Sequence, residues 1–421
     1  MQKIKTYPCG VRLCSDYLSD RKVANISFFV ASGSGFDLPQ KEGIAHFYEH
    51  MFFKSTKNRS AKQILEEMDG LGGMNNAYTS QDKTCYYGKV TVENAEKMFD
   101  ILSDCFFNGL FLEEELKTEK GVVCSEIDKY EDDFMDCCSD ALNAELFKGT
   151  NFSHPILGTK QSVMSITADD LREYREKNNS PGHLIISISG GVTFEEADHF
   201  VTKYILPNYK TTEKPLVYKD TACFNPQIKN NLVKVKKETN QVYFLTSTPT
   251  IRCEHKDYLK LYIGSIMFGG TMSSRLFQRM REKEGIVYVV QSSVETQALC
   301  GNFSCYLITE KGTAKRAMLA YKDEVLKVIK DGFNESEFKN TKQLLKTNLL
   351  ISDDNLDSRA RRNAGSLLNE GKTYDIRKIL DEVSKISLEE VNDCFKQMLQ
   401  KDFIVSIVEK DNNIDYLKLL K

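Results

Sequence analysis

The chain has 421 residues and a mass of 48.1 kDa, which is too long for one ordinary domain and suggests two or more. An apolar fraction of 41% is enough for packed cores, and a net charge of −3 gives no electrostatic case for binding nucleic acid or an anionic membrane. No apolar run reaches the roughly 18 residues that a membrane span needs, and the N-terminus has no apolar signal core.

In the first half, strands and helices are expected in an order that places one apolar, histidine-bearing helix between two strands. The expected strands are 25–35, 84–92 and 183–192, and the expected helices are 43–53, 60–73, 93–107, 113–134 and 193–205. The segment 207–226 is polar, irregular and rich in proline, so it is the best candidate for a linker.

The second half repeats this order in outline. Strands are expected within 232–249 and at 286–295, 301–310 and 402–409, with helices at 256–270 and 273–285 and long helices after 310. The two halves therefore look like two versions of one α+β unit, although the sequence shows no visible identity between them.

The twelve cysteines include no CxxC pair, and several lie in apolar or periodic segments, among them Cys105, Cys124 and Cys394. This pattern fits buried free thiols in a reducing compartment better than a disulfide framework. We expect a soluble, cytoplasmic protein.

Two of the six histidines stand four residues apart in GIAHFYEHMFF, residues 43–53. On a helix, His46 and His50 share one face and can bind one metal ion, and Glu49 lies near that face. Zinc accepts imidazole and carboxylate ligands and keeps one position open for water in catalytic sites, where a glutamate can remove a proton. HxxEH is the reverse of the HExxH motif of zinc proteases; the alternative is a chance pair of helix histidines. The apolar flank is expected to bury this helix through Phe47, Met51 and Phe52.

A third ligand should be acidic and come from another element. The charged helix at 113–134 offers Glu119 and Glu126, which are nearly two turns apart and face the same way. Glu126 follows the apolar run Val122–Cys124 and suits a buried ligand, whereas Glu119 suits a carboxylate that orients a histidine. The alternative for either residue is an ordinary solvated glutamate.

These segments together resemble the pitrilysin/insulin-degrading-enzyme family of inverted-motif (HxxEH) zinc metallopeptidases. In size the chain is closest to the two-domain branch that includes mitochondrial processing peptidase and its bacterial homologues. The likeness covers essentially the whole chain and includes the blocks at 71–87, 154–174 and 268–290. Between His50 and Glu126 lie 75 residues, within a residue or two of the interval that family members use.

The resemblance implies a clamshell-type α+β fold of two homologous half-domains, each a mainly antiparallel sheet flanked by helices. Residues 1–215 would form the zinc-binding catalytic domain and residues 216–421 its homologous partner. One zinc ion per chain would be held by His46, His50 and Glu126. Glu49 would be the general base, and Glu119 matches the second acidic position of the family.

The resemblance also implies two substrate-binding elements. The segment Asn75, Asn76, Ala77, Tyr78 and Thr79 would be an exposed strand edge that pairs with a peptide through main-chain hydrogen bonds; taken alone, it reads as an ordinary strand.

In the second half, Arg281 and Tyr288 match an Arg/Tyr pair that family members aim at the substrate backbone and the reacting carbonyl. Arg275 and Arg279 are nearby competitors that only spacing separates from Arg281. Taken alone, Arg281 reads as a surface helix arginine and Tyr288 as a strand residue of the core.

The resulting prediction is a zinc-dependent endopeptidase that cuts unfolded peptides or leader and signal segments inside a closed chamber. A two-domain chain must pair to close such a chamber, so a homodimer or a heterodimer with a related chain is expected. The alternatives are the catalytic subunit of a partner-dependent processing peptidase, and a non-catalytic peptide-binding or structural subunit such as the respiratory-complex core proteins of this superfamily. The intact ligand set and the absence of a presequence argue against the non-catalytic alternatives.

Overall fold

The computed structural model describes residues 2–226, 228, 231–298, 300–411 and 414–420, and the chain forms two compact units. Unit 1 comprises Met1–Asp128, His154–Asp220 and Ile351–Tyr374, and unit 2 comprises Lys129–Ser153, Thr221–Leu350 and Asp375–Lys421. None of the helices within the described ranges combines the length and apolar character that a bilayer crossing requires.

Unit 1 is built on a six-stranded sheet with the order β1-β2-β6-β3-β5-β4, in which only β2 and β6 run parallel. Its strands are β1 (Gln2–Thr6), β2 (Arg12–Tyr17), β3 (Val23–Val30), β4 (Met74–Thr79), β5 (Thr84–Thr91) and β6 (Leu184–Gly190). Its main helices are α1 (Ile44–Phe52), α2 (Ala61–Leu71), α3 (Ala95–Asn108), α4 (Glu113–Asp132), α6 (Lys160–Ser165), α7 (Ala168–Asn178), α8 (Phe194–Phe200) and α12 (Leu356–Glu370).

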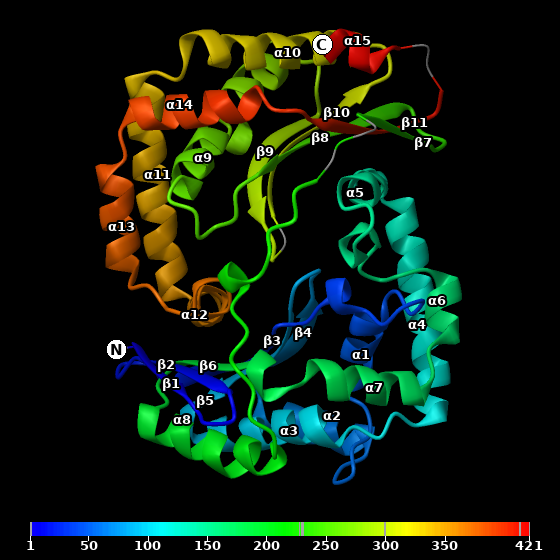
Figure 1. Ribbon diagram of the computed structural model, residues 1–421, viewed down its shortest axis with the longest axis vertical. Helices are drawn as coiled ribbons and strands as arrows, with labels where there is room; N and C mark the ends of the chain where they lie inside the picture. Colours follow the sequence, from blue (N-terminus) through cyan, green and yellow to red (C-terminus); the bar gives the residue numbers. More distant parts are fainter. Residues whose placement is uncertain (1, 227, 229–230, 299, 412–413, 421) are drawn as a thin grey trace. The chain divides into compact units, whose positions relative to one another are not determined.

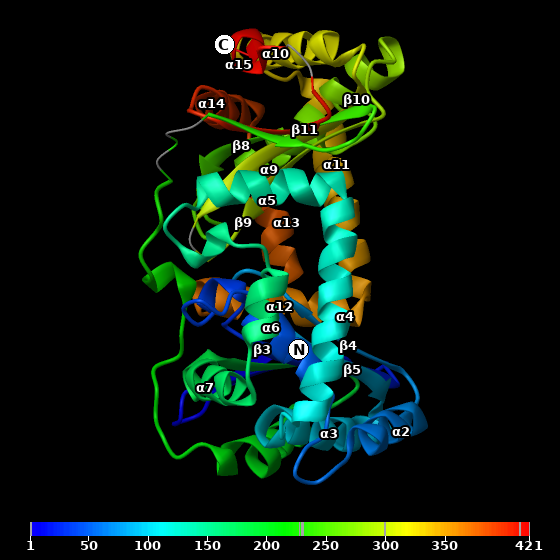
Figure 2. The same ribbon diagram turned by 90° about the vertical axis from the view of Figure 1, so that its right-hand side faces the viewer.

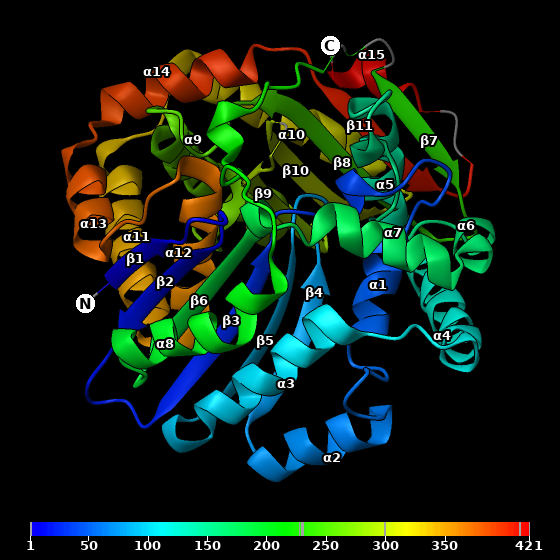
Figure 3. The ribbon, with the colours of Figure 1, turned by 60° about the horizontal axis from the view of Figure 1, so that its bottom comes forward.

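The two faces of this sheet differ in chemistry because side chains alternate along each strand. Apolar side chains such as Phe28 and Ile186 project from one face into the core, which α3 and α8 cover (Figure 3). The opposite face carries polar side chains such as Asp16, Asn25 and Ser187, and α12 lies across it. A helix from the C-terminal half of the chain therefore covers the polar face of the unit 1 sheet.

Unit 2 is built on a five-stranded sheet with the order β7-β11-β8-β10-β9 (Figure 1). Its strands are β7 (Leu232–Lys236), β8 (Gln241–Thr250), β9 (Val289–Thr296), β10 (Gly301–Glu310) and β11 (Ile404–Glu409). Its main helices are α5 (Phe134–Leu146), α9 (Tyr258–Ser265) with its continuation η8 (Ile266–Gly270), η9 (Phe277–Lys283), α10 (Ala314–Asp331), α11 (Glu335–Asp354), α13 (Ile376–Lys385), α14 (Leu388–Leu399) and α15 (Tyr416–Leu420). Figure 2 shows α5 along one face of the sheet and α14 on the other.

The two sheets share one topology. Each sheet has five corresponding strands when β1 is left aside, and we number these by their order in the chain. Across both sheets they lie in the order first, fifth, second, fourth and third, and the first and fifth strands form the parallel pair. This agreement confirms the prediction of two α+β units with mainly antiparallel sheets. Neither compact unit is a continuous half of the chain, because α5 joins the second sheet and α12 joins the first. The sequence predicted that the first repeat ends at residue 215, and this boundary stays a prediction.

The N-terminus of α1 is fixed by a buried carboxylate and a close backbone contact. Asp37 accepts hydrogen bonds from the amides of Gly43 and Ala45 at 2.6 and 3.0 Å, which are free donors of the first helical turn. Gly43 has φ +88°, and a Cβ atom there would lie 2.3 Å from the carbonyl oxygen of Leu157. Only glycine therefore suits this position, and the loop that precedes α6 sets where α1 begins.

Candidate active site

Helix α1 buries its apolar face and leaves its two histidines on another. Phe47, Met51 and Phe52 are buried in the core of unit 1, as predicted. The rings of His46 and His50 lie side by side with centroids 4.7 Å apart. The spacing of four residues thus places both imidazoles on one face of the helix.

Helix α4 brings a carboxylate to both imidazoles. Oε2 of Glu126 lies 3.3 Å from Nε2 of His50 and 3.8 Å from Nε2 of His46. One donor atom from each of the three residues lies within 4.8 Å of the other two. The structure therefore brings the three predicted ligands together, and their binding of zinc stays a prediction.

The second nitrogen of His50 faces another carboxylate. Nδ1 of His50 lies 3.2 Å from Oε2 of Glu119, whose Oε1 accepts a 2.5 Å hydrogen bond from Nζ of Lys54. The bond with His50 lowers the pKa of Glu119. Burial alone lowers the pKa of His50, but Glu119, followed by Glu126 and Glu49, raises it overall. Glu119 thus occupies the place of a group that orients a ligating histidine.

The burial of the two glutamates differs from the expectation. The side chain of Glu119 is only 10% exposed, whereas that of Glu126 is 31% exposed. Val122, part of the apolar run that suggested a buried Glu126, is itself 47% exposed. The expectation of a buried Glu126 was therefore wrong, because the inward face of α4 includes Leu116, Glu119, Val123 and Ile127 instead.

The donor set fits a zinc ion. Burial, followed by the proximity of His50, lowers the pKa of His46 to about 3, so this imidazole is neutral and its Nε2 can act as a ligand. Its Nδ1 is buried without a hydrogen-bond partner among the described residues. Two imidazoles and one carboxylate form a ligand set of catalytic zinc sites that leaves a fourth position open.

Glu49 is tied to strand β4. The hydroxyl of Thr79 donates a 2.6 Å hydrogen bond to Oε2 of Glu49. Burial raises the pKa of this carboxyl, and the bond from Thr79 counteracts part of the rise. Oε1 has no hydrogen-bond partner among the described residues. A raised pKa and one unbound oxygen suit a group that accepts and returns a proton.

Strand β4 is an edge strand, and half of its backbone groups face outward. Among the strands that the structure describes, it pairs with β5 alone, and Ser80 N donates to Lys83 O at the end of their hairpin. Hydrogen-bonded and non-bonded pairs alternate in an antiparallel ladder, so the amides and carbonyls of Asn75, Ala77 and Thr79 point away from β5. The amide of Ala77 is bonded to the side chain of its neighbour Asn76 at 2.8 Å. The predicted segment thus has the free edge that pairing with a peptide requires.

Arg281 and Tyr288 lie together in unit 2. The guanidinium of Arg281 stands 5.6 Å from the ring centroid of Tyr288 and 5.2 Å from that of Phe277. Both predicted residues are exposed, and Tyr288 is 68% exposed rather than in the core. Across the described part of the chain, Arg281 makes no hydrogen bond or ion pair, so its five N–H groups are available to a ligand.

The two competing arginines are already engaged. Arg275 makes two hydrogen bonds to Glu337, at 2.7 and 2.8 Å, and a third to a backbone carbonyl. Arg279 binds Glu284 and Glu324, each at 2.9 Å, and also a third carboxylate. Arg275 and Arg279 therefore hold helices of unit 2 together, whereas Arg281 makes no such bonds to the described residues. Sequence spacing alone could not show this difference.

Sequence reasoning missed two residues of the site and a second role of Thr79, which it had named only as part of the substrate-binding strand. Asp37 holds the start of α1, Lys54 holds Glu119, and the hydroxyl of Thr79 holds Glu49. Lys54 lies two residues beyond the end of α1, so helical spacing from His50 does not indicate its contact. The contacts of Asp37 and of the Thr79 hydroxyl likewise depend on tertiary packing, for which the sequence carries no signal.

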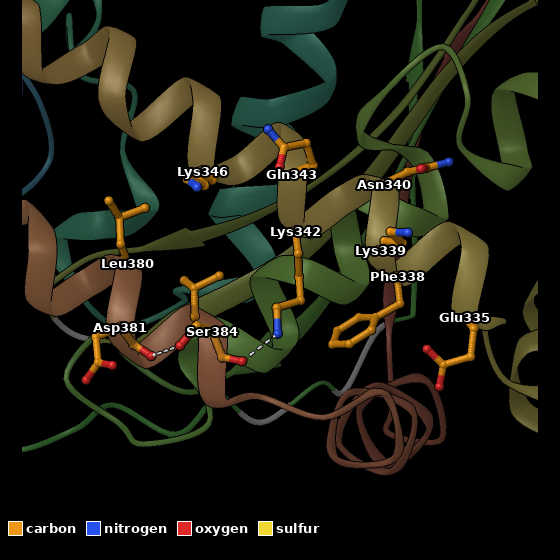
Figure 4. A pocket seen from close by; sticks show the side chains of 11 residues that line it. Glu335, Phe338, Lys339, Asn340, Lys342, Gln343, Lys346, Leu380, Asp381 and Ser384 are labelled. Atoms are coloured by element: carbon orange, nitrogen blue, oxygen red, sulfur yellow. Dashed lines mark hydrogen bonds between the residues drawn. The ribbon is translucent and has the colours of Figure 1, made fainter.

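Unit 2 also has a cleft of about 760 Å³ between α11 and α13 (Figure 4). Its lining includes the lysines Lys339, Lys342 and Lys346, but no histidine or cysteine. Nζ of Lys342 donates to the carbonyl oxygens of Ser384 and Ile386 and so caps the end of α13. This cleft lacks the paired acid–base and metal-binding groups that α1 and α4 bring together.

Comparisons with known proteins agree with this arrangement. The sequence profile of the insulinase family, peptidase family M16, matches residues 12–160, and that of the peptidase M16 inactive domain matches residues 165–345. The chain is 32% identical over 415 residues to the uncharacterized zinc protease YmxG of Bacillus subtilis, covering 98% of this chain and 99% of that protein. It is 29% identical to an uncharacterized zinc protease of Mycobacterium leprae, covering 96% and 90% of the two chains.

Solved structures show the same fold. A protease from Helicobacter pylori superposes with a TM-score of 0.86 at 17% identity, covering 97% of this chain and 99% of the other. A peptidase M16 inactive domain from Pseudomonas fluorescens superposes with a TM-score of 0.88 at 16% identity, covering 98% of each chain. With two family profiles spanning most of its length, this chain belongs to the insulinase family, peptidase family M16.

Proposed function

We propose that this protein is a zinc-dependent endopeptidase with one zinc ion per chain. The observation that carries the proposal is the meeting of His46, His50 and Glu126, with His50 oriented from behind by Glu119. Two relatives that align along almost the whole chain are named zinc proteases, which supports the same activity here. The complete ligand set also argues against a purely structural or peptide-binding role.

The chemistry follows from the positions of the protein's own groups. His46, His50 and Glu126 would hold the zinc ion, which would supply Lewis-acid polarisation of the scissile carbonyl and of the attacking water. Glu49 takes a proton from that water and later passes it to the leaving amine. The hydrogen bond from Thr79 fixes Oε2 of Glu49, so that the free Oε1 is the atom that carries the proton.

The substrate is an extended peptide that adds a strand to the free edge of β4. The outward amides and carbonyls of Asn75 and Thr79, together with the carbonyl of Ala77, would bind its main chain, which gives affinity without strong sequence dependence. Because a folded protein cannot present a free strand, the preferred substrates are unfolded peptides or leader and signal segments.

Arg281 and Tyr288 are the proposed donors to the substrate backbone and to the oxyanion. In our proposal a homodimer or a heterodimer with a related chain closes a chamber, and these two residues act on the metal centre of the partner. A partner-dependent processing peptidase is the narrower version of this function. Because all twelve cysteines are free thiols, we place the protein in the reducing cytoplasm.

The decisive experiment replaces Glu49 by glutamine. Glu49→Gln protein should retain about one zinc ion per chain, measured by elemental analysis, and lose cleavage of an unfolded test peptide. Undiminished cleavage would remove Glu49 from the mechanism, and absence of zinc from wild-type protein at neutral pH would reject the proposal.

A mixing experiment tests the shared site. Glu49→Gln chains are combined with chains that carry both Arg281→Ala and Tyr288→Phe, and peptide cleavage is measured. Recovered activity supports sites built from two subunits. Continued inactivity of the mixture would contradict the shared site.

A further inference from the structure

Helix α12 lies on the polar side of the unit 1 sheet, and one of its cations has no ion-pair partner in the described part of the chain. The other charged side chains in its middle are engaged within this unit. Asp357 binds Lys89 and Asn25, and Arg359 binds Asp16 at 2.8 Å. Arg362 is paired with a carboxylate that precedes α12. These bonds fix the helix on the sheet and leave Arg361 as the exception.

Arg361 stands over an aromatic ring of the edge strand. Its guanidinium carbon lies 5.8 Å from the ring centroid of Tyr78, which belongs to β4. Arg361 is exposed and makes no ion pair or hydrogen bond with any residue that the structure describes. An arginine held against an aromatic face keeps its edge N–H groups free for a carboxylate. Its position therefore suits an anion that arrives from outside the chain.

The alternation of β4 places this cation on a defined side of a bound peptide. Thr79 points towards α1 and bonds Glu49, whereas Tyr78, the preceding residue, points towards α12. A peptide strand paired with β4 alternates in the same way. Every second side chain of that peptide would thus project to the side on which Arg361 stands.

We propose that Arg361 is a specificity-determining residue that favours peptides with an aspartate or glutamate beside Tyr78. This inference rests on the proposed peptide binding along β4 and adds a side-chain preference to it. Asp82, an acid four residues after Tyr78 in the same hairpin, is bonded to Lys83 and Ser80. A carboxylate on the substrate is therefore the partner that we assign to Arg361. A bidentate pair of arginine and carboxylate provides both the geometry and the charge for this selection.

The test uses a set of unfolded peptides that are identical and neutral except for one position, which carries glutamate or glutamine. The position is moved in turn along the cleaved segment, and kcat/KM is measured for each pair. Wild-type protein should favour glutamate about fivefold at one position, or at two positions separated by one residue, as expected for a partly exposed ion pair.

Substitutions of Arg361 test whether this residue causes the preference for glutamate. Arg361→Gln should bring the glutamate-to-glutamine ratio to about one, and Arg361→Glu should shift the preference to a lysine peptide. Arg377→Gln is the matched control, because this arginine of α13 has a side chain that is 90% exposed and lies in unit 2. The control should keep the wild-type ratio.

A measurement of peptide binding tests this inference separately from the proposed catalytic activity. The same peptides, labelled with a fluorophore, are titrated into Glu49→Gln protein with and without Arg361→Gln, and anisotropy gives each Kd. Failure of zinc-loaded wild type to cut any peptide would reject the proposed activity. Equal Kd values for the glutamate and glutamine peptides, no binding of either, or a preference that survives Arg361→Gln would overturn the role of Arg361.

Discussion

The hydroxyl of Thr79 lies 2.6 Å from Oε2 of Glu49, so the edge strand β4 and the histidine helix α1 are joined at one carboxylate. The residue next to this contact in the strand, Tyr78, faces the opposite side. A peptide paired with β4 would therefore be positioned by the same strand that positions the proposed general base. In the proposed mechanism, this one hydrogen bond would couple substrate binding to proton transfer.

We expect Thr79→Val to lower kcat/KM about tenfold and to leave the zinc content unchanged. Valine keeps the shape of threonine but removes the donor to a charged group, a bond that contributes about 1.5–3 kcal/mol. Peptide cleavage and elemental analysis measure the two effects. Thr79→Ser retains the hydroxyl and should keep most of the activity. Full activity in the valine variant would show that Glu49 needs no such support.

Replacement of Glu119 by glutamine should weaken zinc binding about 10–100-fold, because the carboxylate that orients His50 is lost. Competition with a chromophoric chelator measures the affinity. The matched control is Glu114→Gln, since Glu114 is an exposed acid on the same helix. If both variants bound zinc as tightly as wild type, Glu119 would have no role in holding the ligand.

The sequence predicted local features of the fold well. Strands such as β6 and β11 and the long helix α4 formed where hydrophobic periodicity placed them. The HxxEH spacing also indicated correctly that His46 and His50 share a helix face. In each case the evidence lies within a few consecutive residues, where period and spacing determine which side chains share a face.

Features that depend on distant packing were not predicted. Nothing local distinguishes α5 and α12 from neighbouring helices, yet each packs on the sheet of the other half of the chain. The carboxylate partner of Lys54 and the exposure of Glu126 likewise depend on how α4 docks against α1. Glu119 and Glu126 were both candidates on the charged helix, and the family resemblance supported Glu126 as the ligand, because no short-range pattern joins it to the histidines.

Stability should depend on pH through Asp140 of α5. Burial, followed by the proximity of the Asp136 carboxylate, raises the pKa of this carboxyl from 3.8 to about 6. The folded state therefore holds the proton more tightly than the unfolded state, so the stabilisation is complete below about pH 4 and is lost as pH rises through 6. Above pH 6 the ionised Asp140 disfavours the fold.

We thus expect Asp140→Asn to raise the melting temperature by about 2–4 °C at pH 7.5, which corresponds to ~1 kcal/mol after screening by solvent. At pH 4 the variant and wild type should melt together. Differential scanning calorimetry at the two pH values measures this, with the exposed Asp132→Asn as the control. An equal gain at both pH values would trace the effect to something other than ionisation.

The two arginines of η9 should differ in their effects: Arg279 should support stability, and Arg281 should support activity. Arg279→Ala leaves the buried Glu324 without one of its cations, which should cost about 2–3 kcal/mol and lower the melting temperature by about 5–10 °C.

Arg281 has no such partner among the described residues, so the Arg281→Ala variant should have the melting temperature of wild type. Its kcat/KM should fall by about 10²–10³ through loss of a donor to the oxyanion or the substrate backbone. Arg281→Lys keeps the charge without the planar fork and should recover only part of the loss. A large fall in melting temperature for Arg281→Ala, or unchanged cleavage, would contradict its assignment to the substrate, because the contacts of Arg281 with the rings of Phe277 and Tyr288 lie at the protein surface and add little to stability.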